Sequence, residues 1–180
     1  TQLVSSQQET NIQEEKLRIL PDSSWFLGLI DSKDSHHTAV LSSFGALLPY
    51  KPIFYIPAIV YLETLSHLTR VNKISVKRAY DTIERILVKL NYKHSQSLRI
   101  EDIVKKYKIF SRIRIKRLRP LDFYIVTEGI GLGARILTCD LDMYTTTRKY
   151  YKKIYFLTDK LGKKESDLGN LIKDIQSERS

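Results

Sequence analysis

The order of short apolar runs and helix-like stretches constrains the fold of this 180-residue chain more than any other sequence feature. Four runs are short, apolar and bounded by turn or helix-start residues, which is typical of buried strands. They cover residues 17–20, 53–56, 134–138 and 153–157. Helix patterns separate them, at residues 25–30, about 35–48, 57–70, 75–90 and from 120 to 131 or 133. This alternation predicts a mostly parallel sheet with helices on both faces.

Caps and breakers set the limits of these helices. Asp34 or Ser35 is placed to cap the helix that runs through Leu48, and Pro120 suits the first turn of a later helix. The region 98–119 is ambiguous, because it shows helical spacing first and strand-like alternation afterwards. We favour a helix followed by a short extended piece there.

The chain is expected to form one domain over residues 17–158, between a polar N-terminal tail at 1–16 and a polar C-terminal tail at 159–180 that is either helical or frayed. The first residues are polar and do not resemble a signal peptide. No apolar run approaches the ~18 residues that a membrane-spanning helix needs. Cys139 is the sole cysteine, which excludes an intrachain disulfide. We therefore expect a cytoplasmic protein that does not use a membrane.

The formal net charge of +10 suits a polyanionic partner such as nucleic acid, an anionic membrane or an acidic protein. Simple solubility is the alternative, because net charge does not identify a partner. Basic residues are densest just before Asp122, where they could neutralise RNA phosphates or form a solvated helix face. The candidate RNA-binding residues there are Arg112, Arg114, Lys116, Arg117 and Arg119.

A second basic group, Arg148 and Lys149, lies among tyrosines at 144, 150 and 151. This mixture could combine contacts to a nucleic-acid backbone with base stacking. The tyrosines equally suit packing in the core or at an interface.

Acidic residues gather at the ends of the predicted elements. Asp22 directly follows the first strand, Asp140 and Asp142 follow the third, Asp122 opens a helix, and Glu63 lies on the helix after the second strand. Ligands of open α/β sheets bind beyond the carboxyl ends of the strands, so these acids could converge at one edge.

Each acid also has a purely structural interpretation. Asp22 could cap a helix, and Asp122 could interact with a helix dipole. Asp140 and Asp142 could form a turn, and Glu63 could be a solvated helix residue. By spacing alone, both interpretations stay open.

Chemistry favours a hard cation if the acids do converge. Carboxylates packed closely repel one another unless a divalent ion neutralises them. Mg²⁺ and Mn²⁺ prefer oxygen ligands, and such an ion promotes attack of water on a phosphate. In so basic a chain, this combination predicts hydrolysis of RNA.

Four segments in order resemble PIN domains, most closely the single-domain PIN ribonucleases of the VapC toxin type. They are RILPDSS at 18–24, IPAIVYLE at 56–63, LDFYIV at 121–126 and ARILTCD at 134–140, and the resemblance spans residues 17–157. It implies a Rossmann-like three-layer α/β/α sandwich whose mostly parallel sheet has about five strands. It also implies an endoribonuclease site that uses Mg²⁺ or Mn²⁺.

The resemblance assigns roles to particular residues. The catalytic metal ligands would be Asp22, Glu63, Asp122 and Asp140, and Asp142 matches a further acid of some members. Thr138 matches a hydroxyl residue that supports the site. Ser23 could contact a carboxylate or a phosphate.

The resulting hypothesis is a metal-dependent endoribonuclease, with the toxin of a toxin–antitoxin pair as its specific form. By resemblance, it would act as a homodimer, and an antitoxin protein would block its acidic cleft. One alternative is a catalytically silent PIN module that binds RNA or protein. Another is a PIN nuclease of RNA processing or DNA repair.

Overall fold

A computed structural model describes residues 16–95, 118–159 and 166–178. In these residues, five parallel strands form one sheet in the order β3-β2-β1-β4-β5. The strands are β1 (Arg18–Pro21), β2 (Ile53–Ile56), β3 (Tyr92–His94), β4 (Arg135–Thr138) and β5 (Ile154–Phe156). The four predicted strands are confirmed.

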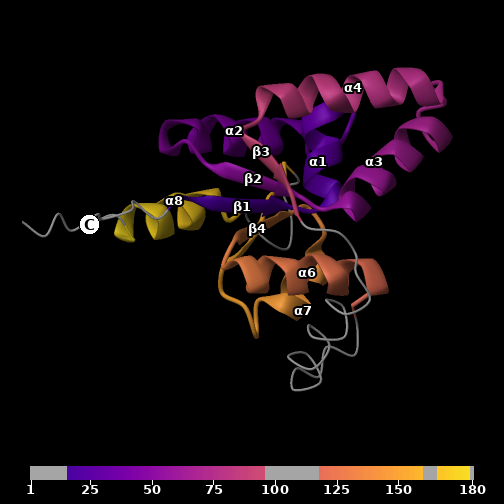
Figure 1. The fold of residues 1–180 in the computed structure, drawn as a ribbon. Coiled ribbons are helices and arrows are strands. Elements are labelled where there is room, and N and C mark those ends of the chain that lie inside the picture. Colours follow the sequence, from indigo (N-terminus) through magenta and orange to yellow (C-terminus); the bar gives the residue numbers. More distant parts are fainter. Residues whose placement is uncertain (1–15, 96–117, 160–165, 179–180) are drawn as a thin grey trace, which may run out of the picture.

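Helices cover both faces of the sheet (Figure 1), which confirms the three-layer α/β fold class. One face carries α1 to α4, and the other carries α6 and α7. Their bounds are α1 (Ser23–Ile30), α2 (His37–Leu47), the 3₁₀ helix η1 (Leu48–Tyr50), α3 (Ala58–Arg70), α4 (Val76–Lys89), α6 (Pro120–Leu132), α7 (Leu141–Thr147) and α8 (Leu168–Ser177).

The strand order determines where a ligand site is expected in this sheet. The chain runs from β1 to β2 and β3 on one side, and later adds β4 and β5 on the other side of β1. The carboxyl ends of β1 and β4 are therefore neighbours at the point where the strand order reverses, which is where open α/β sheets bind ligands. Register supports this, because Pro21 pairs with Leu137 and the Asp22 N–H donates to the Leu137 carbonyl at 2.9 Å.

Glycine lets α6 pack closely against β4. A Cβ atom at Gly129 would lie 2.5 Å from Cγ1 of Ile136, so the absence of a side chain lets α6 approach β4. The helix ends at Gly133, whose φ of 60° is left-handed. Asp122, in the first turn of α6, is thereby carried towards the end of the sheet.

Some local predictions were wrong. Neither Asp34 nor Ser35 caps α2; His36 holds that position without a side-chain bond, while Asp34 accepts from the His36 N–H at 2.8 Å. Strand β3 and helix α7 were not predicted. β3 is an edge strand with no buried residue, and α7 is short and rich in threonine. Most of the ambiguous region 98–119 lies outside the described residues.

The C-terminal helix packs on the domain. Leu171 and Ile175 of α8 are buried in the hydrophobic core. The Tyr155 hydroxyl donates to Asp174 at 2.7 Å, and Arg135 pairs with Glu178 at 2.6 Å. The packed core therefore extends beyond residue 158, into the stretch predicted to be a polar tail. Within the described ranges, no helix has the length and apolar character needed to cross a membrane.

Candidate active site

Asp22 is the deepest carboxylate of the site, with 3% of its surface exposed. It follows β1 and is the N-cap of α1. One carboxylate oxygen, Oδ1, accepts from the Ser24 hydroxyl at 2.7 Å and from the Trp25 N–H at 2.8 Å. The other, Oδ2, accepts from the Thr138 hydroxyl at 2.6 Å. The structural interpretation of Asp22 as a helix cap is thus correct, and the same side chain faces the end of β4.

Burial governs the ionisation of Asp22. Desolvation raises the pKa of this carboxyl group to about 6, although the bonds from Thr138, Ser24 and Trp25 act to lower it. Among the described residues, no Lys, Arg or His forms an ion pair with Asp22. Within the described ranges, its negative charge is therefore stabilised by neutral donors.

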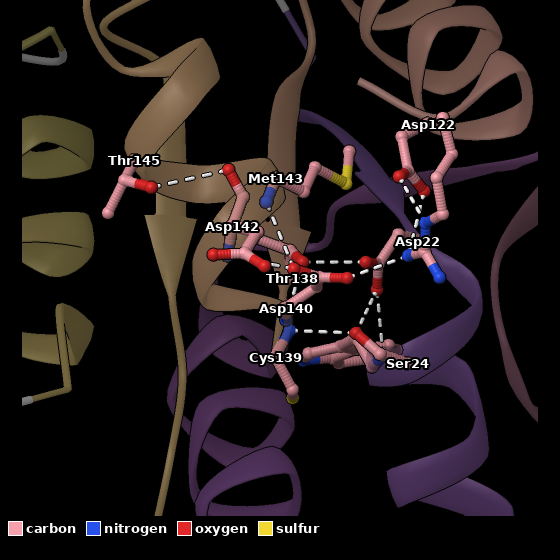
Figure 2. A network of polar contacts seen from close by, with 11 residues as sticks. Asp22, Ser24, Asp122, Thr138, Cys139, Asp140, Asp142, Met143 and Thr145 are labelled. Atoms are coloured by element: carbon pink, nitrogen blue, oxygen red, sulfur yellow. Dashed lines mark hydrogen bonds and ion pairs between the residues drawn. The ribbon is translucent and has the colours of Figure 1, made fainter. Parts of the chain in front are cut away.

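Thr138 joins Asp22 to Asp140. Its fully buried hydroxyl donates to Asp22 and accepts from the Asp140 N–H at 2.9 Å. Asp140 Oδ1 in turn accepts from the N–H groups of Asp142 and Met143 at 2.8 and 2.9 Å, which makes it the N-cap of α7. Figure 2 shows this continuous network. One hydroxyl thus couples the carboxyl ends of β1 and β4.

Arg119 connects Asp140 to a third carboxylate, that of Asp122. Its Nε and Nη2 lie 2.8 and 3.3 Å from the two oxygens of Asp122, and Nη2 also lies 2.7 Å from Asp140 Oδ2. The hydrogen bond to Asp122 raises the pKa of the guanidinium most; the charges of Asp122, Asp140 and Glu63 also raise it, and partial desolvation opposes them. Arg119, predicted as part of an RNA-binding stripe, therefore contacts the acids.

Glu63 reaches the site from α3 and is half-buried. It lines a groove of about 650 Å³ between α1 and α3, together with Ser23, His67 and Arg70. Its charge makes only the smallest of the contributions that raise the pKa of the Arg119 guanidinium, after those of Asp122 and Asp140. Hydrogen bonds thus connect Asp22, Asp122 and Asp140 through Thr138 and Arg119, while Glu63 lines the neighbouring groove.

The serine that donates to Asp22 is Ser24, which was not singled out from the sequence. Ser24 also accepts from the Cys139 N–H at 2.8 Å, so it ties the start of α1 to the end of β4. Ser23 lines the groove instead. Both serines follow Asp22 directly, and only the direction in which each side chain leaves α1 distinguishes them. Asp142 is exposed in the first turn of α7.

The remaining basic candidates have different surroundings. Arg112, Arg114, Lys116 and Arg117 lie outside the described residues. Arg148 donates to the Ile154 carbonyl at 3.1 Å and lies over the Tyr155 ring, contacts that hold α7 to β5. Lys149 is exposed.

Carboxylate oxygens are the donors that a hard divalent cation prefers, and Asp22 is a buried carboxylate without a cationic partner among the described residues. The donor atoms present are therefore of the type that Mg²⁺ or Mn²⁺ prefers. In the described part of the chain, no three His, Cys, Asp or Glu side chains are grouped closely enough to hold a metal ion. The guanidinium of Arg119 lies between two of the acids.

Comparison with protein-family models gives a match over most of the chain. A family model described as PIN domain matches residues 19–149, a range that includes all five acids discussed above. No curated protein matches the chain significantly. PIN domains are generally nucleases, a class of hydrolases, and generally use divalent metal ions.

Proposed function

The chain belongs to the PIN domain family, and on that premise we propose that it is a metal-dependent endoribonuclease. One observation carries the proposal. A carboxylate buried to 3% exposure, with no cationic partner among the described residues, lies at the strand-order reversal and is coupled to a second acid by Thr138. Isolated buried charges are unfavourable, so such an arrangement favours binding of a cation.

Asp22, Asp122 and Asp140 would hold the ion, with Glu63 at the groove side. Bound there, a divalent ion lowers the pKa of its water and stabilises negative charge on a phosphate. Thr138 keeps Asp22 Oδ2 in place and anchors the Asp140 backbone. Ser24 restrains the other oxygen of Asp22. The two hydroxyls therefore orient the Asp22 carboxylate, as residues around a metal site commonly orient the metal ligands.

RNA is the proposed substrate, because a net charge of +10 suits a polyphosphate and the basic residues concentrate just before Asp122. The resemblance to VapC-type toxins supports a more specific proposal: a toxin that acts as a homodimer and is inhibited by an antitoxin protein covering the acids. A nuclease of RNA processing or DNA repair would share the same site chemistry.

A nuclease assay with end-labelled RNA and single-stranded DNA tests the proposal. We expect internal cleavage of RNA with Mn²⁺ or Mg²⁺ and none after chelation. The double variant Asp22→Asn/Asp122→Asn should lose activity by at least about 100-fold, since both ligands are weakened. Asp81→Asn, an exposed acid on α4, is the matched control and should cleave normally.

The outcomes separate the alternatives. Cleavage that survives chelation or the double substitution would overturn the metal mechanism. RNA binding without cleavage at any metal concentration would identify a catalytically silent module. Preference for DNA over RNA would move the chain to the repair class.

A further inference from the structure

We propose that Arg119 is a built-in counter-ion of the cation-free site, which holds Asp122 and Asp140 until a divalent ion displaces it. This inference rests on the proposed function, because it concerns the same acids. It assigns Arg119 a role opposite to that of a residue that helps to bind the metal.

The geometry of Arg119 is that of a bridging cation. Its guanidinium meets Asp122 through two nitrogens and Asp140 through one of the same nitrogens, at 2.7–3.3 Å. The partner carboxylates come from the starts of two helices, α6 and α7. A single nitrogen shared by both acids places the positive charge between them, where carboxylates otherwise repel one another.

The local backbone aims the side chain at the acids. Arg119 is the N-cap of α6, with extended backbone at φ −60° and ψ 151°, as expected for a residue before proline. The acid three residues later, Asp122, is in the first turn of α6. Asp140 is 21 positions away and is brought in by the packing of α6 and α7 beside β4.

The exposure of the contact makes it reversible. The Arg119 side chain is 70% exposed, against 13% for Asp122 and 26% for Asp140. Ion pairs this open to water are weak, and a guanidinium can leave them for solvent at little cost. A divalent ion carries twice the charge and binds carboxylate oxygens directly, so it can replace the arginine.

Only part of the site is neutralised in this way. Asp22 makes no ion pair within the described residues and keeps its buried charge on neutral donors. The deep carboxylate therefore still favours an incoming cation, while Arg119 occupies the two outer ones. Metal binding and the Arg119 contacts then compete for Asp122 and Asp140.

A counter-ion that competes with the metal and a residue that positions the metal ligands predict opposite results for Arg119→Gln. If Arg119 is a counter-ion, the variant should bind Mn²⁺ about 3- to 10-fold more tightly, the range expected for losing weak exposed ion pairs. If Arg119 instead holds the ligands in a binding geometry, the variant should bind Mn²⁺ more weakly. Arg119→Lys keeps the charge without the fork and should fall between wild type and Arg119→Gln.

Calorimetric titration of the full chain with Mn²⁺ measures these affinities. Arg85→Gln is the matched control for the loss of one positive charge; Arg85 is exposed on α4 and bonds only within its own helix among the described residues. Its Mn²⁺ affinity should equal that of wild type. As a second readout, the Arg119 Nε–H resonance should shift to a solvent-like position when Mg²⁺ is added.

Equal or weaker Mn²⁺ binding by Arg119→Gln, or an unmoved Nε–H resonance at saturating Mg²⁺, would overturn the inference. If a folded wild type cleaves RNA with Mg²⁺ but these results are negative, the counter-ion role fails and the proposed function stands. If neither protein binds a divalent ion, both fail. Circular dichroism of each variant establishes that the fold is kept, and Arg119→Lys supplies an independent comparison.

Discussion

The two sides of the site stabilise negative charge by different means. On the β1 side, Asp22 is buried and receives bonds from Ser24, Trp25 and Thr138, all neutral donors. On the helix side, Asp122 and Asp140 are more open and share one guanidinium. Buried hydrogen bonds are geometrically demanding, and exposed ion pairs are weak and salt-dependent. The inner carboxylate is thus buried and fixed by three hydrogen bonds, whereas the two outer carboxylates can exchange partners.

The largest effect is expected from Thr138→Val, which nearly preserves volume but removes the hydroxyl. Asp22 Oδ2 would lose its donor and the Asp140 N–H its acceptor, both at a buried position. We expect a loss of about 2–4 kcal/mol in the free energy of unfolding, since each orphaned group costs about 1–3 kcal/mol. Urea unfolding measures it.

Thr64→Val is the control for that experiment. Thr64 is also fully buried, but among the described residues its hydroxyl donates to a single acceptor, the Val60 carbonyl of its own helix. Its loss should cost less than about 1 kcal/mol. Equal losses in the free energy of unfolding would show that the Asp22–Thr138–Asp140 connection adds no more stability than one ordinary buried hydroxyl.

The second prediction concerns pH. Asp22 has a folded pKa of about 6 against 3.8 for the free group, so folding favours its protonated form. Wild-type stability should therefore fall as pH rises from about 4 to 6 and be constant above that for this group. Asp22→Asn does not titrate, and above pH 6 in chelator it should be more stable than wild type by about 1–3 kcal/mol.

Urea unfolding of both proteins at pH 4 to 7.5 tests this prediction. The advantage of Asp22→Asn should shrink towards pH 4, where the folded wild-type carboxyl is protonated and the unfolded one, with a pKa of 3.8, is partly protonated. An advantage that is independent of pH, or absent at pH 7.5, would contradict a buried charge held without a cation. Asp22→Asn should also abolish cleavage, so the substitution would increase stability while it removes activity.

The third prediction concerns the cap formed by Asp140. Asp140→Ala removes the acceptor for the N–H groups of Asp142 and Met143 and should cost about 1 kcal/mol. Asp140→Asn keeps a capping oxygen and should cost less than about 0.5 kcal/mol. Thermal unfolding in chelator compares them; equal losses would mean that the ion pair to Arg119, not the cap, sets the contribution.

The smallest effect is expected from Arg119→Gln in the metal-free protein. Because the guanidinium is 70% exposed, its two ion pairs should together contribute less than about 1 kcal/mol, and the difference should vanish in 0.5 M salt. A loss of more than about 2 kcal/mol in the free energy of unfolding that persists in 0.5 M salt would contradict the difference between the two sides of the site.

Local patterns predicted much of the fold. Residues 53–56 and 134–138 read as strands because short apolar runs bounded by Pro or Gly are distinctive. Strand β3 was not predicted because Tyr92–His94 lies at the sheet edge and has no buried residue, so it shows no apolar run. The prediction that Asp34 caps α2 was wrong because its side chain accepts a hydrogen bond from the His36 N–H in a turn before the helix.

The sequence by itself determined the alternation of strands and helices and put Asp22, Asp122 and Asp140 at element ends, because these features depend on residues adjacent in the chain. Only the tertiary structure decided how the acids are partnered. Thr138 bonds Asp22 across 116 positions, and Arg119 bonds Asp140 across 21. Such contacts follow from strand order and helix packing, so a local pattern could place Arg119 among basic neighbours but could not show that it turns towards the acids.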